Sequence, residues 1–414
     1  MRPLIVRALT LSAATAAGLA LAVVATGPRA GAATARPAVV TPAVLGPVLG
    51  YVANSGSDSV TPFIPSLNQP GPPIPIDGSP TAMIAPPNGQ YVWVASSRGF
   101  TAIGTHSNQA SGLIPVPGGV GSMAYHNSVW VTAGHPLANR TEVIPVSETG
   151  MTAGSPVTFA PGPGAGPAPL VYGRYTMNFY AGSALGVVTE ILPHSGRIGR
   201  VIPFGVKDPH GTAHLAVSPD GLIMYAWITD PARTSTTVTP IRLDTGKAGK
   251  PVTVGQGPQA ILFSADSHTA WVLSSGAGPV TSVHAKVTPV SAFTGKTAPP
   301  ISLGPTASDA WMSMTLDGRK LYVSVRWAGK HANSLFSIST ATHTIFKEIR
   351  TSYPGPVAFT PDGKTAFVID GGPGLGQGAV VSVTTATDAY HPGFVVGEGP
   401  VAIVVLRQGK AQTG

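Results

Sequence analysis

The residues best suited to acid–base chemistry lie in the segment Asp-Pro-His-Gly-Thr-Ala-His, which begins at Asp208. Its two imidazoles, His210 and His214, and the carboxylate of Asp309 further along the chain are groups that transfer protons in hydrolases and lyases. Two residues four apart on an extended chain lie roughly 13 Å from each other, so the two histidines cannot share one metal ion without a bend. We predict no metal and no other cofactor, and we keep His210, His214 and Asp309 as an alternative catalytic site.

A second group of side chains is suited to binding. Arginine offers a planar, permanently charged fork that pairs with carboxylates, phosphates and other polar groups. Four arginines fall in predicted loops of one face, where an amide and an indole accompany them. The candidates for ligand binding are Arg98, Arg140, Arg233, Gln259, Arg326 and Trp327. The alternative is that these arginines are ordinary solvated loop residues.

Familiar catalytic signatures do not occur in the sequence. It contains no Gly-x-Ser-x-Gly motif, no His-Glu-x-x-His motif and no phosphate-binding P-loop. The glycine-rich run 371–378 lies between two predicted strands, so no helix N-terminus is available there to hold a phosphate. The chain also has no cysteine, which excludes disulfides, cysteine-ligated zinc, iron–sulfur clusters and thiol catalysis.

The composition indicates the kind of fold that must position these groups. Of the 414 residues, 43% are hydrophobic and only 10% are charged, while glycine and proline number 51 and 42. An average globular protein carries about 25% charged residues, so the deficit argues against charged disorder and against helical bundles held by ion pairs. Glycine and proline at this density interrupt long helices. The composition therefore predicts short strands joined by many turns.

A repeated turn organises the chain. Tight turns of the Pro-Asp-Gly type and its relatives are centred at positions 88, 127, 173, 220, 266, 317 and 362, with spacings of 39 to 51 residues. Each turn separates two apolar strands, and a third and a fourth strand follow. Five residues past the turn stands an aromatic side chain, which we interpret as core packing between sheets: Trp93, Tyr225, Trp271, Tyr322 and Phe367. Four-stranded units that recur every 40–50 residues or so are typical of propeller blades.

The two ends of the chain complement each other. Residues 49–76 supply second, third and fourth strands without a first, whereas residues 401–406 form a first strand with nothing after it. Pairing the two segments in one blade closes the ring and removes exposed sheet edges. We predict an all-β protein with a single propeller of eight four-stranded blades, with seven as the alternative. The predicted divisions are a signal peptide at 1–32, a linker at 33–47, the propeller at 48–406 and a tail at 407–414.

Several segments carry a resemblance to a known family. Tyr51–Val60 reads Tyr-Val-Ala-Asn-Ser-Gly-Ser-Asp-Ser-Val, and Thr237–Ile241 followed by Thr245–Gly255 reads as Val-Thr-Pro-Ile, Thr-Gly and Val-Gly elements. Lys286–Gly304 and Ser59–Pro80 repeat this pattern. These segments resemble the YVTN-family β-propeller repeats of exported proteins, in their actinobacterial form. The resemblance covers about residues 48–406 and implies the fold, whereas the activity is not implied because propellers host unrelated functions.

The N-terminus has the pattern of a secretion signal. Arg2 and Arg7 precede an apolar run of 18 residues at 8–25, and Ala-Gly-Ala at 30–32 fits a small-residue cleavage site. The alternative is an uncleaved membrane anchor, because a run of this length is close to the lower limit for a spanning helix. We expect cleavage near residue 32, and therefore a secreted or cell-wall-associated protein without a membrane span.

Charge and chemistry together limit the function. Removal of the signal leaves 22 basic and 17 acidic residues, a net charge of +5, and no nucleic-acid-binding motif is present, so nucleic acid is not a predicted partner. Enzymes need pre-arranged acids, bases or electrophiles, and the predicted loop face has few. We predict a monomeric binding scaffold for an extracellular protein, glycan or cell-wall component. The alternative is a secreted lactonase- or lyase-like enzyme with its site at the mouth of the propeller channel.

Overall fold

The structure is a computed structural model, and it describes residues 47–135, 140–148, 150–160, 168–205, 208, 210–276, 284–328, 331–372 and 374–409. The predicted signal peptide at 1–32, the predicted linker up to residue 46 and the end of the predicted tail at 410–414 lie outside the described residues. Over the described ranges the ordered elements are all β-strands. In the same ranges there is no helix able to cross a membrane.

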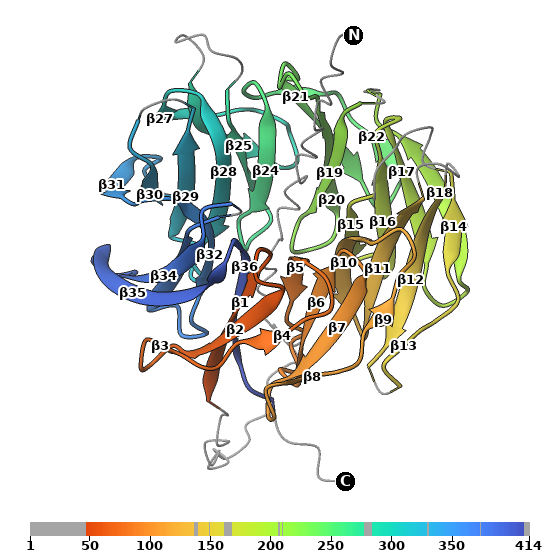
Figure 1. The fold of residues 1–414 in the computed structure, drawn as a ribbon. Coiled ribbons are helices and arrows are strands. Elements are labelled where there is room, and N and C mark those ends of the chain that lie inside the picture. The colour runs from red at the N-terminus through yellow and green to blue at the C-terminus, as the bar shows by residue number, and fades with distance from the viewer. Residues whose placement is uncertain are drawn as a thin grey trace, which may run out of the picture.

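The strands form eight antiparallel sheets arranged radially, as the blades of a propeller (Figure 1). Each blade is named here from its inner strand outward. Blade I contains β36 (Pro400–Arg407), β1 (Val48–Asn54), β2 (Ser59–Ile64), β3 (Gln69–Pro70) and β4 (Ile74–Pro75); blade II β5 (Pro80–Ile84), β6 (Tyr91–Ser96), β7 (Gly99–Gly104), β8 (Gln109–Ala110) and β9 (Ile114–Pro115); blade III β10 (Val120–His126), β11 (Ser128–His135), β12 (Arg140–Ser147), β13 (Thr152–Ala153) and β14 (Val157–Phe159); and blade IV β15 (Leu170–Gly173), β16 (Asn178–Ser183), β17 (Val187–Leu192) and β18 (Arg197–Pro203).

The second half of the ring follows the same plan. Blade V contains β19 (Thr212–Val217), β20 (Ile223–Thr229), β21 (Thr237–Arg242), β22 (Lys247–Ala248) and β23 (Val252–Thr253); blade VI β24 (Pro258–Phe263), β25 (Thr269–Ser274), β26 (Ala285–Ser291) and β27 (Ile301–Gly304); blade VII β28 (Ala307–Met314), β29 (Lys320–Trp327), β30 (Ser334–Ser339) and β31 (Ile345–Arg350); and blade VIII β32 (Pro354–Phe359), β33 (Thr365–Asp370), β34 (Gln377–Thr384) and β35 (Ala389–Glu398). In blades I, II, III and V the outermost strand is broken into two short pieces. In blade I the break falls at Gly71-Pro72-Pro73, where the prolines cannot donate to a ladder.

The ring is closed by the two ends of the chain. β36 pairs antiparallel with β1 from Val48↔Arg407 to Asn54↔Pro400, so the last strand is the inner strand of the first blade. This pairing confirms the predicted closure and the count of eight blades, and it removes the alternative of seven. Circular closure leaves each inner strand covered by its neighbours.

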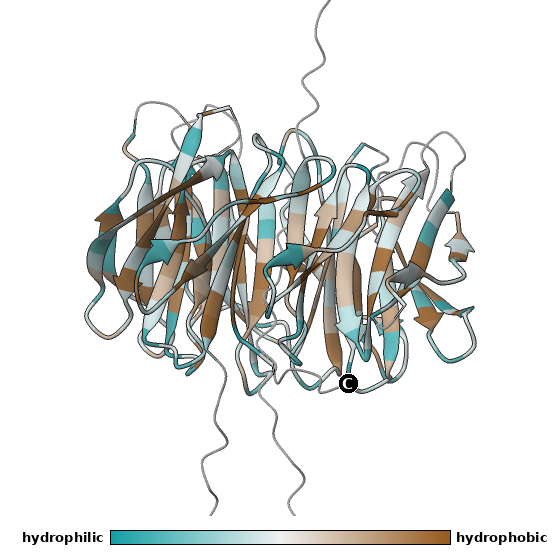
Figure 2. Cartoon of the chain, turned by 60° about the horizontal axis from the view of Figure 1, so that its bottom comes forward, coloured by the Kyte–Doolittle hydropathy of each residue, from teal (hydrophilic) through white to brown (hydrophobic). Residues whose placement is uncertain are grey.

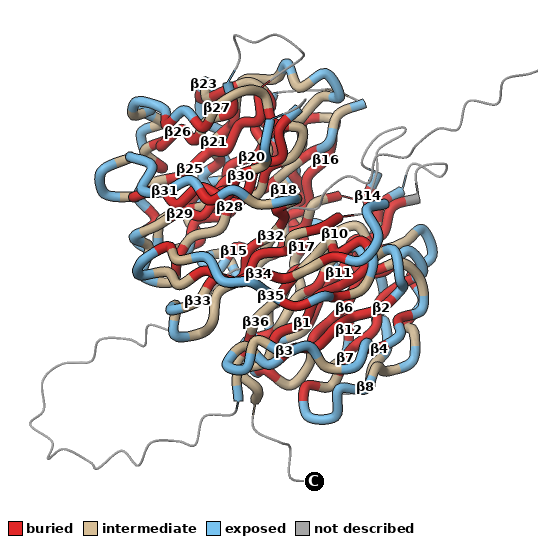
Figure 3. The backbone as a smooth tube through the Cα atoms, turned by 60° about the vertical axis from the view of Figure 1, so that its left-hand side comes forward, coloured by how far each residue is buried: buried red, intermediate tan, exposed pale blue. Residues whose placement is uncertain are grey.

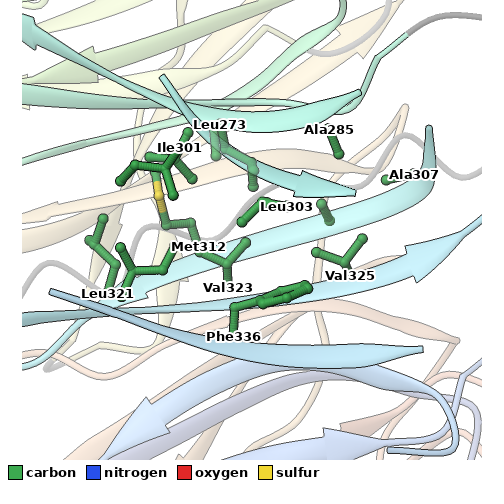
Figure 4. Packing of buried hydrophobic residues seen from close by; sticks show 14 of the residues in the cluster. Leu273, Ala285, Ile301, Leu303, Ala307, Met312, Leu321, Val323, Val325 and Phe336 are labelled. Carbon is green, nitrogen blue, oxygen red and sulfur yellow. The ribbon is translucent and has the colours of Figure 1, made fainter. Parts of the chain in front are cut away.

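An aromatic side chain at one register position fills the space between neighbouring blades. In all eight blades the second strand carries this residue, and each is at most 6% exposed: Tyr51, Trp93, Trp130, Tyr180, Tyr225, Trp271, Tyr322 and Phe367. The predicted core role of the five aromatics found from the sequence is confirmed. Figure 4 shows one such junction, where Leu273 and Ile301 of blade VI pack against Met312 and Val323 of blade VII.

Two of these aromatics donate a hydroxyl to the turn between the third and fourth strands of the next blade. That turn carries a residue with positive φ, which is Asn108 (52°) in blade II and Asp388 (53°) in blade VIII. Tyr51 donates its hydroxyl to Asn108 Oδ1 at 2.7 Å, and Tyr322 donates to Asp388 Oδ1. The polar side chain on each of these turns therefore joins one blade to the next.

A second bridge repeats in the turns between the first and second strands. In blade VIII, Thr360 donates its hydroxyl to Asp362 Oδ1 at 2.6 Å, and the backbone N–H of Lys364 donates to the same oxygen at 3.1 Å. The equivalent aspartates of blades V, VI and VII are bridged in the same way: Asp220, Asp266 and Asp317. A short acidic side chain that accepts from its own turn stabilises this conformation, which explains why the sequence repeats it.

The antiparallel order of the strands divides the connections between two faces of the disc, which Figure 2 shows from the side. The turn face carries the first-to-second and third-to-fourth connections. The loop face carries the second-to-third and fourth-to-first connections. Both described ends of the chain lie on the turn face, where Gln408 donates its backbone N–H to the carbonyl of Pro47 at 2.9 Å. Buried residues concentrate on the strands, whereas exposed residues follow the connections and the rim (Figure 3).

Candidate functional site

Most inner strands begin at the loop face with an irregularity. In six blades, I, II, III, VI, VII and VIII, one extra residue interrupts the pairing of the inner strand with the second strand. Such a β-bulge re-aims a side chain. Blade V differs, because β19 pairs regularly with β20 from Thr212 to Val217. His214 therefore keeps its place in the normal alternation of the strand.

The two histidines of the alternative catalytic site lie in different settings. His210 is exposed, and its backbone N–H donates to Asp208 Oδ1 at 3.0 Å. His214 is half-buried on β19, and its ring stacks on that of Trp227 with centroids 5.1 Å apart. Burial lowers the pKa of His214 to about 4, so its imidazole is neutral at neutral pH and can accept a proton or a hydrogen bond.

Asp309 lies two blades away from His214. It is half-buried on β28, stands opposite Arg326 of β29 in the strand register, and shares that face of blade VII with Trp311. Blade VI stands between Asp309 and His214. The structure therefore places the three candidate acid–base residues on the same side of the propeller without bringing His214 and Asp309 into hydrogen-bond contact.

Arg326 belongs to the framework of the propeller. The sequence placed this residue in a loop, but β29 extends through it and its side chain is only 6% exposed. Its guanidinium lies 3.7 Å from the ring centre of Tyr353 and 4.4 Å from that of Trp311. Nε donates to the carbonyl of Pro354 at 2.8 Å and Nη2 to that of Gly371 at 2.9 Å. Burial lowers the pKa of Arg326, against the opposing charge of Asp309. Arg326 thus fastens blade VII to blade VIII.

Arg233 is also held by the protein itself. It lies in the second-to-third loop of blade V with a positive φ of 56°. Its Nη1 donates to the carbonyl of Ala307 at 2.8 Å, and its Nη2 donates to that of Ser308 at 2.6 Å. Because both acceptors belong to blade VII, the side chain reaches past blade VI and fixes the loop of blade V to the loop face.

Arg98 and Arg140 point outward. Arg98 forms an ion pair with Asp77 at 2.6 Å, and its side chain is 67% exposed. Arg140 forms an ion pair with Glu142 at 3.2 Å, and its side chain is 47% exposed. Exposed pairs of this kind contribute little to stability. These two arginines are the predicted ligand-binding candidates that remain accessible on the loop face.

The other two candidates are used within the sheet. Gln259 is the bulged residue of β24, and its Oε1 accepts the backbone N–H of Ala310 in blade VII at 3.2 Å. Trp327 was placed in a loop by the sequence, but it ends β29 and is 8% exposed within the cluster between blades VI and VII. Its ring meets that of Phe336 edge-on at 6.1 Å. Trp327 is therefore part of the hydrophobic core, because β29 is longer than the sequence indicated.

The loop face of blade V contains a shallow hollow of about 340 Å³. Its lining consists of two carboxylates, a run of hydroxyl residues and one aliphatic side chain: Asp208, Asp230, Thr234, Ser235, Thr236, Thr237 and Ile228. The hydroxyl run 234–237 was not among the residues predicted from the sequence, although four consecutive Ser and Thr residues shortly after Asp230 are a visible signal. Across the described residues, no group of three or more His, Asp and Glu side chains is arranged to hold a metal ion.

The carboxylate of Asp230 shapes one wall of this hollow. Its Oδ2 accepts the hydroxyl of Thr234, and its Oδ1 accepts the backbone N–H of Ser235 at 3.1 Å. Burial alone would raise the pKa of Asp230, but these hydrogen bonds outweigh it and hold the pKa below its ordinary value. The side chain is therefore ionised at neutral pH and keeps the loop in one conformation.

Comparison with known proteins defines the class. No protein-family model and no curated protein matches the chain. Among solved structures, the dihydro-heme d1 dehydrogenase NirN in complex with DHE has a TM-score of 0.65 at 17% identity over 86% of this chain and 74% of that chain. A hydrazine synthase from Kuenenia stuttgartiensis has a TM-score of 0.55 at 14% identity, covering 77% of this chain and 95% of its own. A protein from Lactobacillus plantarum has a TM-score of 0.55 at 14% identity, covering 87% of this chain and 100% of its own. The chain is thus an eight-bladed β-propeller, and these identities carry no statement about its ligand.

Proposed function

We propose that the chain is an exported binding propeller that presents its loop face to a protein, glycan or wall polymer at or beyond the cell surface. Export is supported by the leader-like N-terminus, with Arg2 and Arg7 before the apolar run at 8–25. The proposal includes a secreted or cell-wall-associated location and a monomeric chain. Propellers commonly serve as scaffolds on which loops supply the function.

The observation that carries the proposal is the position of the chain ends. Val48 pairs with Arg407 at the turn face, so any segment that precedes residue 47 joins the propeller on that side. The loop face lies on the opposite side of the ring, and it carries the accessible guanidinium groups of Arg98 and Arg140. A leader that tethered the chain to the envelope would therefore leave the loop face directed away from the tether.

We also propose that the chain belongs with the YVTN-type repeat propellers. The signature-like segment forms β1, a turn and the start of β2. Asn54 is fully buried there, and its Nδ2 donates to Thr61 Oγ1 at 3.0 Å and to Ser59 Oγ at 3.3 Å. Asn54 thus closes the loop between the second and third strands, which gives this residue of the segment a structural role.

The test is retention of the purified mature chain on its own cell envelope. We expect the wild type to co-sediment with the envelope, and the double variant Arg98→Ala/Arg140→Ala to be retained several-fold less. The matched control is Arg319→Ala, because Arg319 is an arginine with an 84% exposed side chain beside a carboxylate, Asp317, on the turn face. Equal loss in the control, or no retention of the wild type, would contradict the proposal.

A secreted lactonase- or lyase-like activity is the second candidate, and one observation favours it. The neutral imidazole of His214 is half-buried on an inner strand beside the loop face, a state in which it can act as a general base. A screen of lactones and cyclic esters, with His214→Ala and Asp309→Ala as comparisons, tests it. Turnover that disappears in both variants would support the enzyme and displace the binding proposal.

A further inference from the structure

We propose that the hollow on the loop face of blade V binds a neutral or amino-bearing saccharide unit. This inference rests on the proposed function, in which the loop face binds a ligand outside the cell, and it names the chemical class of that ligand. The hollow is lined by Asp208 and Asp230, by the hydroxyl run 234–237 and by Ile228. Sugar hydroxyls need acceptors and donors close together, which carboxylates and Ser or Thr hydroxyls supply.

The negative charge of the carboxylates that line the hollow restricts the class of ligand that can bind there. Among the described residues that line the hollow, the charged side chains are the two carboxylates, and none of these residues is basic. Hydrogen bonds to an ionised carboxylate are stronger than those between neutral groups. A neutral sugar can donate its hydroxyls to these carboxylates, and an amino sugar adds an attractive charge, whereas an anionic sugar is repelled. The hollow therefore differs from Arg98 and Arg140, which favour anionic groups.

The lining groups keep hydrogen-bonding capacity for a ligand. Asp208 Oδ1 accepts the backbone N–H of His210 at 3.0 Å, which leaves lone pairs on the carboxylate. Thr234 uses its hydroxyl proton on Asp230, so its oxygen remains an acceptor. Thr236 and Thr237 add two further half-buried residues with hydroxyl groups along the same edge. Ile228 also lines the hollow, but it is only 2% exposed and packs into the hydrophobic core between blades IV and V.

The wall of the hollow is fixed before a ligand arrives. Arg233 fastens the loop to the carbonyls of Ala307 and Ser308. The carbonyl of Ser235 accepts the N–H of Gly257 at 2.9 Å, and that of Thr236 accepts the N–H of Val254 at 2.8 Å. A site that is already ordered loses less conformational freedom on binding. The volume lies near the lower end of ligand pockets, which suits roughly one or two sugar rings.

A different hollow shows that this chemistry is not a general property of the surface. The groove between blades I and II has a volume of about 830 Å³ and is lined mainly by prolines and apolar side chains, together with the amides of Gln69, Asn108 and Gln109. None of the described residues in this lining is charged, so the groove has no carboxylate to accept from a sugar hydroxyl. Among the described residues, the hollow of blade V combines carboxylates with adjacent hydroxyls at a loop that is held from three blades.

The experiment is saturation-transfer NMR and calorimetry on the mature chain with a panel of free sugars. The probes are the methyl glycosides of glucose, galactose, mannose and arabinose, with glucosamine, N-acetylglucosamine and glucuronic acid. We expect binding of at least one neutral or amino sugar and none of glucuronic acid. Asp208→Asn and Thr236→Val should each weaken binding roughly tenfold or more, whereas the exposed loop-face control Glu398→Gln should bind like the wild type.

The outcomes separate this inference from the proposed function. Sugar binding that neither Asp208→Asn nor Thr236→Val weakens would overturn the site. If the chain binds calcium but none of the sugars, and Asp208→Asn abolishes calcium binding, the saccharide proposal is wrong and the hollow is a cation site. Envelope retention without binding of any sugar in the panel would overturn the inference and leave the binding propeller standing. The thermal unfolding midpoint of each variant identifies misfolding, and Thr236→Val keeps the test valid if Asp208→Asn does not fold.

Discussion

At the turn face, the same pair of hydrogen bonds, from a Ser or Thr hydroxyl and from a backbone N–H, is accepted by Asp220, Asp266, Asp317 and Asp362. At the loop face, no two of the connections that carry candidate residues are built alike. Arg233 reaches across a blade to two carbonyls, Arg326 is enclosed by aromatic rings, and Arg98 is exposed beside Asp77. We infer that the repeated aspartate turns stabilise the turn face, whereas the connections of the loop face can differ from blade to blade.

Polar groups at the turn face also join neighbouring blades. Asp388 is 5% exposed and accepts hydrogen bonds from Lys320 Nζ at 2.8 Å and Ser337 Oγ at 3.0 Å, in addition to Tyr322. Between blades IV and V, Arg200 donates to Glu190 Oε2 at 2.8 Å and to the carbonyl of Leu243 at 2.8 Å. Substitutions in these groups are therefore expected to change stability, whereas substitutions of exposed loop-face residues are expected to change binding.

The largest effect is expected for the aromatic that fills a blade junction. Trp271→Ala removes a side chain that is 2% exposed between blades VI and VII, so it should lower the free energy of unfolding by about 3–5 kcal/mol. Urea denaturation followed by circular dichroism measures the change. His343→Ala removes the ring that meets Trp271 edge-on at 5.1 Å and should have a smaller effect. Equal effects would contradict the core role of the aromatic.

The next effect concerns Glu190 and depends on pH. Burial alone would raise the pKa of Glu190, but hydrogen bonds from Arg200, Asn178 and Tyr180 lower it to about 2. Because the folded pKa lies below the unfolded value of about 4.3, this stabilisation is present above about pH 5 and is lost as the pH falls toward 2. With Arg200 38% exposed and partly screened by solvent, the group contributes about 2 kcal/mol.

Glu190→Gln should remove that acid dependence. We expect the free energy of unfolding of the wild type to fall by about 1 kcal/mol more than that of the variant between pH 6 and pH 3, about half of the total contribution. Glu398→Gln, at an exposed position, should follow the wild type throughout. Parallel pH curves for the wild type and Glu190→Gln would show that the ionised Glu190 carboxylate adds no stability through its hydrogen bonds in blade IV.

A smaller effect is expected at the repeated turn. Asp362→Ala removes the acceptor of the Thr360 hydroxyl and of the Lys364 N–H, so it should lower the free energy of unfolding by about 1 kcal/mol. The side-chain hydrogen bond from Thr360 also lowers the pKa of Asp362, so the loss should shrink as the pH falls below the ordinary aspartate pKa of about 3.9. Thermal unfolding at pH 7 and pH 2.5 measures both. A pH-independent loss would exclude the ionised acceptor as its cause.

The smallest effect on stability is expected on the loop face. Arg98→Ala breaks an ion pair whose side chains are 67% and 50% exposed, so it should change the free energy of unfolding by less than about 0.5 kcal/mol. Calorimetry on the variant checks this value. A loss comparable to that of Asp362→Ala would mean that the loop face also carries part of the stability, and the comparison of the two faces would fail.

Local turn chemistry is why the fold could be predicted from the sequence. An aspartate before a glycine acts within its own turn, so its recurrence revealed the blades without any knowledge of contacts. The sequence did not predict the same core role for Tyr51, Trp130 and Tyr180, because these residues do not stand five positions after a Pro-Asp-Gly turn. In the structure they occupy the same register position in the sheet as the other aromatics. Register is a property of strand pairing and becomes visible only in the structure.

The candidate site was less predictable, because its parts come from several blades. Arg233 looked like a free cation in the sequence, but its acceptors lie 74 and 75 residues away. Arg326 and Trp327 looked like loop residues, but β29 continues through both. The hollow of blade V combines Asp208 with a loop more than twenty residues further along the chain. Contacts between residues this far apart in the sequence cannot be predicted from the spacing of residues along the chain.

The most direct measurement is hydrogen–deuterium exchange of the mature chain, free and bound to its envelope fraction. We predict that binding slows exchange in the second-to-third and fourth-to-first connections of the loop face, above all at 97–98 and 230–236. The exchange rates of the turn-face turns at 218–221 and 360–363 should not change. Protection confined to the turn face would contradict the account, because the face that carries the chain ends would then be the one that binds.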